Sequence, residues 1–398
     1  GLDYFKYILV VKLKFFLLVF TIFSFFIDSG GPIGIRNLSI IIVLMYAFAY
    51  IYKKIYVTSR LKGVKKIAKS YIFFSIFYLS FILFGFLSAS INQISFGDAM
   101  KWLLPLLFYF VFLFYFSSFK FEVLTKGISL GSFCFSFVIL AVFFTALLVP
   151  MPVGKALFEF LSFMPGWFYY RQGGAVPNYP NIYFQATLCL TSFSIMSYIY
   201  GYKKITIFIL LSLAFSLSRT GIFIAITFIV FYSFLSYEFQ KRISNLIQII
   251  FLFMVPMIII IEFVIFLQLQ DGYVHNYNGL NIRIGHVISA VSEWYGFNVL
   301  FGSGPGSYFF SIGVEKFVDN IEVSQVEMLR KYGLIGSLLF HLSLVFYLKW
   351  LTDYQQYALV FVVFSFYIVS FTNPVLTTFL FSMLLGITTA ITIKGIKR

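Results

Sequence analysis

The sequence predicts an all-α polytopic membrane protein that forms a single integral membrane domain over residues 1–398. Hydrophobic residues make up 61% of the chain and charged residues only 11%, and the mean hydropathy is +0.96. Soluble globular domains do not have this composition. Apolar runs of roughly 15–22 residues follow one another with little polar sequence between them, as bilayer-spanning helices require. The charge of the connecting segments also alternates from one run to the next, which predicts a topology.

Twelve apolar runs are predicted to be transmembrane helices. They cover residues 13–27, 37–52, 70–90, 102–117, 127–149, 182–201, 205–217, 221–236, 246–267, 333–348, 357–372 and 375–393. The two runs within 205–236 are short, so this stretch is also compatible with broken or re-entrant helices. Cys134 and Cys189 fall inside predicted helices, where packing is a more natural role than a disulfide. With only three histidines in addition, no metal site and no cofactor are expected.

The basic residues are concentrated on one side of the predicted membrane. The N-terminus, the C-terminal tail and alternate connections contain twenty of the 29 Lys and Arg residues but only four of the 14 acids. The strongest signal is the segment 53–69, with seven basic residues and no acid. The positive-inside rule therefore predicts that both termini are cytoplasmic. Because the basic residues serve this orientation, a nucleic-acid partner is not expected.

Two connections on the opposite side are much longer than the others. Residues 150–181 form one loop, and residues 268–332 form another of about twice the length. Both are rich in aromatic residues, Gly and Pro, and neither has the composition of a linker. A membrane protein that places two large loops on one face is expected to carry its chemistry there.

Three arginines on the external side are candidates for binding a phosphate-containing group. Arg171 lies in the first large loop, Arg283 lies in the second, and Arg219 lies between two short spans. A guanidinium group stays charged and offers a fork of donors that matches phosphate oxygens. Three such groups on one face suit a diphosphate. The alternative is that they reach lipid headgroups or pair with acids, as arginines at helix ends commonly do.

The second large loop also contains a glycine-rich turn. Gly304 and Gly306 belong to the segment Gly302-Ser303-Gly304-Pro305-Gly306-Ser307. Such a turn allows backbone N–H groups to surround a phosphate, although most clusters of this kind are only turns.

Four short motifs follow one another in the second half of the chain. They are Arg171-x-Gly173 before Pro177-Asn178; Ser216-Leu217-Ser218-Arg219-Thr220-Gly221; Arg283 followed by Phe301-Gly302-Ser303-Gly304-Pro305-Gly306-Ser307-Tyr308-Phe309; and Leu329-Arg330-Lys331-Tyr332-Gly333-Leu334-Ile335-Gly336. In order, spacing and side they resemble the O-antigen polymerase and O-antigen ligase superfamily of bacterial envelope glycosyltransferases. The resemblance covers about 165 residues, whereas the N-terminal third matches only in hydropathy. It implies a GT-C-like polymerase/ligase fold.

One departure from the superfamily pattern separates its two activities. Many ligase-like members carry a His-Asn pair eleven residues before the glycine of the closing motif, and here that position is Glu322. The missing histidine favours a polymerase over a ligase. Glu322 is the first candidate for the base that accepts the proton of the acceptor hydroxyl, and Glu327 is the second. The alternative is that both are solvated carboxylates on one helix.

The resemblance implies polymerisation of undecaprenyl-diphosphate-linked oligosaccharide repeat units at the periplasmic face of a bacterial inner membrane, without a metal ion. Arg171, Arg219 and Arg283 would then stabilise the departing diphosphate, with Gly304, Gly306 and Asn178 beside them. Candidate sugar-stacking residues are Tyr169, Tyr170 and Trp294.

The implied partners are membrane lipids and a chain-length-regulating co-polymerase. Two other functions remain open, namely an O-antigen ligase and a lipid-linked oligosaccharide flippase or other transporter. A transporter fits twelve spans, but transporters usually show paired repeats and charges at the membrane midplane.

Overall fold

The computed structural model describes residues 2–29, 33–57, 68–148, 168–171, 181–184, 186–216, 218–269, 272, 279–321, 323–372 and 375–395. The helices are α1 (Leu2–Ile27), α2 (Ile35–Val57), α3 (Lys69–Ile91), α4 (Phe96–Ser117), α5 (Phe121–Leu148), α7 (Leu190–Ile199), α8 (Lys203–Phe215), α9 (Arg219–Phe234), α10 (Tyr237–Leu269), α11 (Gly279–Ser292), α12 (Asn298–Phe301), α13 (Ser324–Asp353), α14 (Tyr357–Val369) and α15 (Phe379–Gly395), with the 3-10 helix η1 (Thr187–Cys189). Two antiparallel hairpins pair β1 (Phe168–Arg171) with β2 (Asn181–Phe184) and β3 (Phe309–Ser311) with β4 (Lys316–Val318).

The all-α polytopic membrane architecture is confirmed. Each of the twelve predicted spans coincides with one helix among α1–α5, α7–α10 and α13–α15. Within the described part of the chain, seven helices are long and apolar enough to cross a membrane, and four more apolar helices are shorter. Hydropathy thus located the helices, while the number that cross the bilayer stays a prediction.

The beginning of the predicted span 182–201 is wrong as a helix. Asn181–Phe184 forms β2 and Thr187–Cys189 forms η1, so α7 begins only at Leu190. The branched and aromatic residues of β2 favour an extended strand beside β1. A short apolar run does not distinguish a strand from a helix by hydropathy alone.

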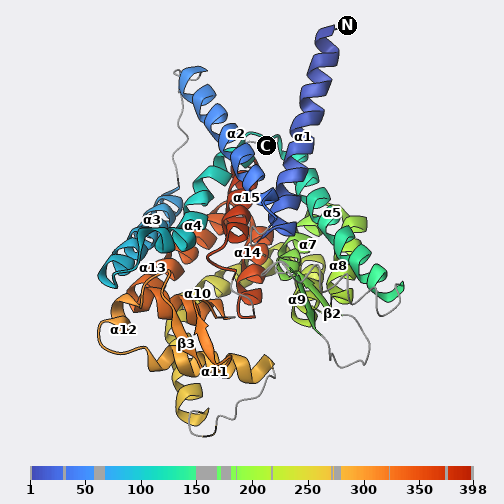
Figure 1. Cartoon of the computed structure of the whole chain (residues 1–398). Coiled ribbons are helices and arrows are strands. Elements are labelled where there is room, and N and C mark those ends of the chain that lie inside the picture. The colour runs from blue at the N-terminus through green and yellow to red at the C-terminus, as the bar shows by residue number, and fades with distance from the viewer. Residues whose placement is uncertain are drawn as a thin grey trace.

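Contacts between distant segments sort the loops onto two ends of the helix bundle. At one end, Ser70 Oγ donates to Asp353 Oδ2 (2.9 Å), which joins the start of α3 to the end of α13. At the other, Asn92 Nδ2 donates to the Gly302 carbonyl (3.0 Å). The start of α1 and the end of α15 lie at the first end, and α11, α12 and β3 at the second (Figure 1). This grouping agrees with the predicted sorting of the loops, and we refer to the second as the loop-bearing end.

The centre of the bundle is formed by the last three helices. Almost every side chain of α14 and α15 is buried, including Val360, Phe361 and Leu384. α13 packs along α3, and α15 packs along α4. Tyr347 of α13 hydrogen bonds to Thr388 Oγ1 (2.6 Å), which pairs these two hydroxyl groups inside the core.

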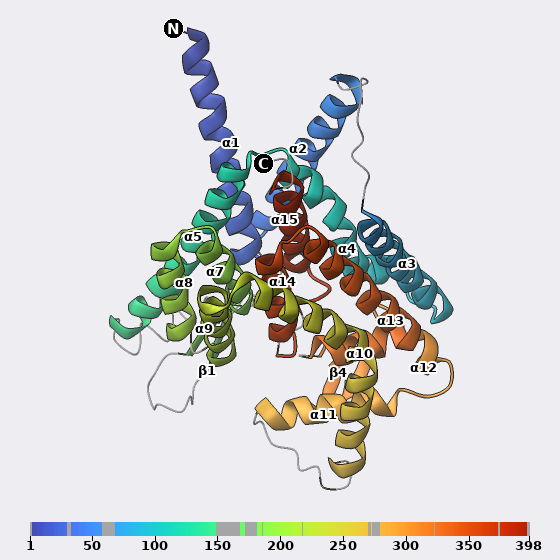
Figure 2. The same ribbon diagram turned by 180° about the vertical axis from the view of Figure 1, so that it is seen from behind.

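Much of the second large loop folds as a small layer on the loop-bearing end. Helix α10 is 33 residues long and continues toward α11, as Figure 2 shows. Helix α11, the β3–β4 hairpin and the start of α13 enclose a separate apolar cluster that contains Val287, Phe309, Ile321 and Val326. The layer supports the residues at the start of α13.

Candidate functional site

The glycine-rich turn and the closing motif contact each other through their backbones. Gly333 has φ 60° and ψ −168°, which breaks α13 into two helical parts. Gly302 faces it with φ 73°. A Cβ atom added at Gly302 would overlap the Lys331 carbonyl, and one added at Gly333 would overlap the Leu300 carbonyl. Only glycine tolerates both the backbone conformation and the close approach.

Hydrogen bonds fix the turn to α13. The backbone N–H of Ser303 donates to the Arg330 carbonyl (2.8 Å), and that of Gly304 donates to the Lys331 carbonyl (2.9 Å). Gly306, with φ 95°, approaches the backbone of Asp98 at the start of α4. These contacts explain the glycines by packing. Because the Gly304 N–H already has an acceptor, the role of Gly304 and Gly306 in binding phosphate stays a prediction.

Three charged side chains at the start of α13 form a buried cluster. Glu327, Arg330 and Lys331 are 5%, 3% and 1% exposed. Their spacing of three and four residues brings them together on one face of a helix. Arg330 binds the Glu327 carboxylate with two donors, Nε to Oε2 at 3.0 Å and Nη2 to Oε1 at 2.9 Å. Lys331 Nζ lies 2.7 Å from Glu327 Oε1.

Arg330 joins this cluster to the second large loop. Its Nη1 donates to Ser307 Oγ (2.9 Å) and to Ser303 Oγ (3.2 Å). Its Nη2 donates to the carbonyl of Asp319 (3.3 Å). The guanidinium carbon also lies 4.4 Å from the centre of the Phe309 ring. With all these partners Arg330 is a structural link between α13 and the loop.

Lys331 is far less well paired than Arg330. Its Nζ lies 2.9 Å from the centre of the Trp102 ring of α4, and the ion pair with Glu327 is its only polar contact among the described residues. Outside the helix, the half-buried carboxyl group of Glu293 interacts electrostatically with the same cluster. Burial raises the pKa of its carboxyl group, the Arg330 charge lowers it, and the Glu327 charge raises it.

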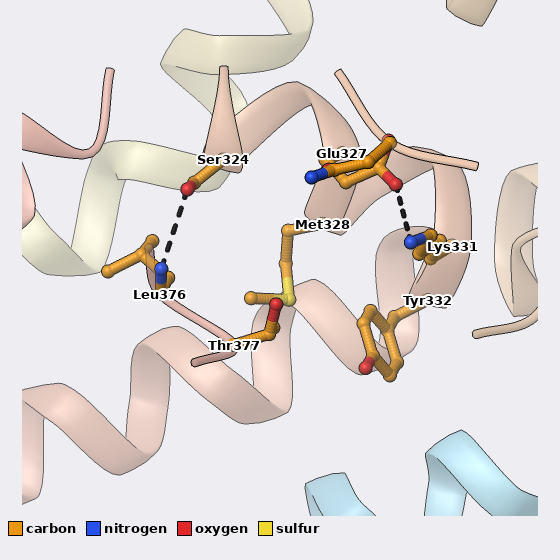
Figure 3. Close-up of a pocket in the computed structure, with 8 residues that line it drawn as sticks. Ser324, Glu327, Met328, Lys331, Tyr332, Leu376 and Thr377 are labelled. Atoms are coloured by element: carbon orange, nitrogen blue, oxygen red, sulfur yellow. Dashed lines mark hydrogen bonds and ion pairs between the residues drawn. The ribbon is translucent and has the colours of Figure 1, made fainter. Parts of the chain in front are cut away.

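A pocket of about 250 Å³, counted with its open mouth, lies beside the cluster (Figure 3). It is lined by Asn320, Ser324, Glu327, Met328, Lys331, Tyr332, Leu376 and Thr377. Two of its polar atoms, Tyr332 Oη and Asn320 Oδ1, have no hydrogen-bond partner among the described residues, and Lys331 Nζ has only its ion pair with Glu327. Ser324 Oγ accepts from the backbone N–H of Val375 (3.0 Å), which holds the opposite wall in place.

Arg219 lies at the same end of the bundle as this pocket. It is the first residue of α9, is exposed, and forms no hydrogen bond or ion pair with a described residue. Helix α9 ends near the start of α14, because Tyr237 contacts Tyr357 with ring centres 5.0 Å apart. The two helices are therefore antiparallel, and Arg219 is at the end of α14 that carries Ser370. The Ser370 carbonyl accepts from the N–H of Ser324.

The other predicted site residues lie on several elements. Tyr169, Tyr170 and Arg171 lie in β1, with Arg171 opposite Asn181 in the register. Arg283 is half-buried in α11 and has contacts of its own. Trp294 follows α11, and its Nε1 has no partner among the described residues. Asn178 and Glu322 lie outside the described residues.

Sequence analysis missed Arg330 and Lys331 as components of a site. The sequence pattern identified them only as residues of the closing motif and gave them no role in a site. The available signal was the pattern Glu327, Arg330, Lys331 directly before an apolar run, which places three charges on one helical face. Comparisons with protein-family models, with curated proteins and with solved structures found no match to this chain.

Proposed function

We propose that this protein is a glycosyltransferase that polymerises undecaprenyl-diphosphate-linked oligosaccharide repeat units at the periplasmic face of a bacterial inner membrane. The observation that carries the proposal is the position of Arg219. This unpaired cation lies at the loop-bearing end, where the buried charged cluster and the glycine-rich turn are also found. A phosphate-bearing lipid that enters from the bilayer would meet such a group first.

The lengths of α8 and α9 support this placement. They contain 13 and 16 residues, which corresponds to ~20 and ~24 Å at ~1.5 Å per residue. The hydrocarbon core of a bilayer is ~30 Å thick. If α8 begins at the cytoplasmic surface, the turn that carries Arg219 therefore lies below the external surface.

The proposed chemistry is displacement of the lipid diphosphate by a sugar hydroxyl. Negative charge grows on the leaving diphosphate, and fixed cations that interact more strongly with it in the transition state accelerate the reaction. Arg171, Arg219 and Arg283 are proposed for this role. The hydroxyl loses its proton to a base, and Glu322 is preferred because both oxygens of Glu327 are already bound to Arg330 and Lys331. Along the chain Glu322 lies between the pocket residues Asn320 and Ser324.

The test is a gel of the surface polysaccharide from a strain that lacks this chain, with and without complementation. A polymerase predicts that only a single repeat unit remains on the lipid core, because flipping and ligation stay intact. Loss of every surface repeat would contradict the proposal. In that event polymer held on the polyprenyl carrier identifies a ligase, and single units trapped on the cytoplasmic side identify a flippase.

A further inference from the structure

We propose that α12 is seated in the bilayer leaflet at the loop-bearing end, with Phe297 and Leu300 in contact with lipid acyl chains. Sequence analysis places all of 268–332 in a loop outside the membrane, so this is an additional interaction surface. The inference goes beyond the proposed function and does not depend on it, because it concerns only how the chain contacts lipid. Three features carry it: the position of α12 beside α3, its exposed apolar side chains and its internally paired backbone.

The first feature is the contact between α12 and the last turns of α3. Helix α3 is long and apolar enough to cross a membrane. Its exposed apolar stripe continues to its last residue and includes Leu83, Leu87 and Ile91. The end of α12 lies beside the same turns, because Ser88 Oγ donates to the Phe301 carbonyl (2.6 Å) and the Phe301 ring stacks on that of Phe84 with centres 5.8 Å apart. The two helices are side by side in both views (Figures 1 and 2).

Helix geometry gives the depth of this contact. At ~1.5 Å per residue, Ser88 and Phe84 lie ~4 and ~10 Å before the end of α3 at Ile91. Phe84 also lies ~22 Å from Lys69, the first residue of α3, which is less than the ~30 Å thickness of a hydrocarbon core. The end of α12 is therefore level with turns of α3 that face lipid, and does not lie above them.

The second feature is the exposed apolar face of α12. The Phe297 ring lies 6.3 Å from the Phe301 ring. The rings of Phe84, Phe301 and Phe297 thus form a row that leads outward from α3. Phe297 and Leu300, at the outer side of this row, are exposed. Apolar side chains that continue a lipid-facing stripe are stabilised when acyl chains replace water around them.

The composition of the surrounding segment agrees with this environment. Residues 294–314 contain no charged residue and no histidine, and the flanking positions are Glu293 and Glu315. Trp294 and Tyr295 directly precede the α12 turn. These two residue types are enriched where a chain crosses the headgroup level, because an apolar ring and a polar group suit that boundary.

The third feature is a backbone that needs no water. The backbone N–H groups of residues 298–304 all donate to carbonyl groups, either of the same turn or of α13. The carbonyls of Phe301 and Gly302 accept from Ser88 Oγ and Asn92 Nδ2. Irregular backbone is tolerated at membrane depth only where its polar groups are satisfied within the protein. The α12 segment meets this requirement.

The course of the chain after α12 is that of a re-entrant segment. Gly304 approaches the backbone of Ala89 near the end of α3, and Gly306 approaches that of Asp98 in the first turn of α4. The chain therefore lies deepest near Phe301 and rises along α3 to the end from which it came. Contact with lipid at α12 fixes the depth of the glycine-rich turn that follows it.

The depth of α12 is measured on the full-length protein in phosphatidylethanolamine–phosphatidylglycerol vesicles, without any lipid-linked substrate. A nitroxide is attached at Phe297→Cys after Cys134 and Cys189 have been replaced by alanine. Electron paramagnetic resonance then gives the collision rates of the label with oxygen, which is concentrated among acyl chains, and with a polar nickel chelate, which stays in water. Leu83→Cys is the lipid reference, and Lys316→Cys, an exposed charged position of β4, is the water reference.

We expect the chelate to collide with the Phe297 label at least about fivefold less often than with the Lys316 label, because hydrocarbon excludes polar groups. Oxygen should reach the Phe297 label about as often as the Leu83 label. Equal chelate collision at Phe297 and Lys316 places α12 in water and overturns the proposal. Low collision with both reagents also overturns it, and assigns this face to a protein contact such as a second copy of the chain.

A second measurement needs no cysteine replacement. Phe297→Trp and its matched control Phe317→Trp change two phenylalanines that are 77% and 71% exposed at the loop-bearing end. Phe317 follows the charged residues Glu315 and Lys316 on the hairpin. In lipids brominated on their acyl chains, the added emission of Phe297→Trp should fall severalfold, whereas that of Phe317→Trp should change little. An unquenched Phe297→Trp overturns the proposal. Because no polymer is measured, these results are independent of the gel that tests the polymerase.

Discussion

The α8–α9 turn and the start of α13 each present an arginine at the loop-bearing end, but in opposite surroundings. Arg330 is 3% exposed and binds Glu327, Ser303 and Ser307. Arg219 is exposed and binds no described residue. A cation whose N–H donors are already bound to partners within the protein stabilises the fold. A cation whose donors have no partner in the described structure is available to bind a substrate. The comparison therefore separates a residue that holds the site together from one that is proposed to act in it.

The largest effect is expected from Arg219→Ala. We expect polymer to become undetectable, a loss of at least ~100-fold in turnover, because one fixed donor to a developing negative charge has about this effect. The protein should still insert and accumulate, since Arg219 pairs with nothing in the described structure. Surface polysaccharide gels and an immunoblot of membranes measure both. Lys203→Ala, at the opposite end of α8, is the control, and normal polymer from Arg219→Ala would remove this arginine from the mechanism.

The next effect concerns the two candidate carboxylates. Glu322→Gln keeps the shape of the side chain and removes the proposed base, so turnover should fall by about 100-fold while stability is unchanged. Glu327→Gln should act on stability instead, because it leaves Arg330 and Lys331 without their counter-ion. Turnover and melting temperature, measured on both variants, separate the roles. Full turnover in Glu322→Gln would place the proton acceptor elsewhere.

Arg330→Met should lower the stability of the fold around the site, and should not act on turnover alone. It leaves the buried Glu327 carboxylate with Lys331 only and frees the Ser303–Ser307 segment. Removal of one partner from a buried ion pair costs about 3–5 kcal/mol, which thermal unfolding in detergent should reveal. Lys101→Met, which removes an exposed partner of Asp98, should leave the melting temperature nearly unchanged. Equal melting temperatures for the two variants would contradict the assignment of Arg330 as a link.

The smallest of these effects is expected from Gly333→Ala. The backbone conformation at this position is accessible almost only to glycine, so an alanine should cost roughly 1–3 kcal/mol. The added methyl group also overlaps the Leu300 carbonyl, which pushes the loop away from α13. Gly97→Ala in the first turn of α4 would meet only Ser95 Oγ, at 4.0 Å, and is the control. An unchanged melting temperature for Gly333→Ala would show that the backbone contact is dispensable.

Hydropathy was sufficient to locate the long apolar helices, because the composition of such a run indicates a helix without any knowledge of its neighbours in space. The buried cluster was not predictable in the same way. Three charges on one face of a helix usually indicate a solvated surface, and here they are buried by Trp102 of α4 and by the 302–309 segment. Those partners are distant in sequence, and no local pattern connects them. The packing of the glycine-rich turn was not predictable for a related reason, since its glycines allow an approach by another backbone as readily as one by a phosphate.

The contact between Gly302 and Gly333 has a consequence for the order in which the chain assembles. Ser88 at the end of α3 donates to the Phe301 carbonyl, across 213 positions of sequence. The pocket acquires its walls only after α13 and the 375–377 turn have left the ribosome. Until then α3 and α4 are in the membrane without their main partners, α13 and α15. Contacts between segments so far apart in the sequence form slowly, because closing the long intervening loop costs conformational entropy. The pocket thus forms late, and a chain released before residue 375 would enter the membrane without it.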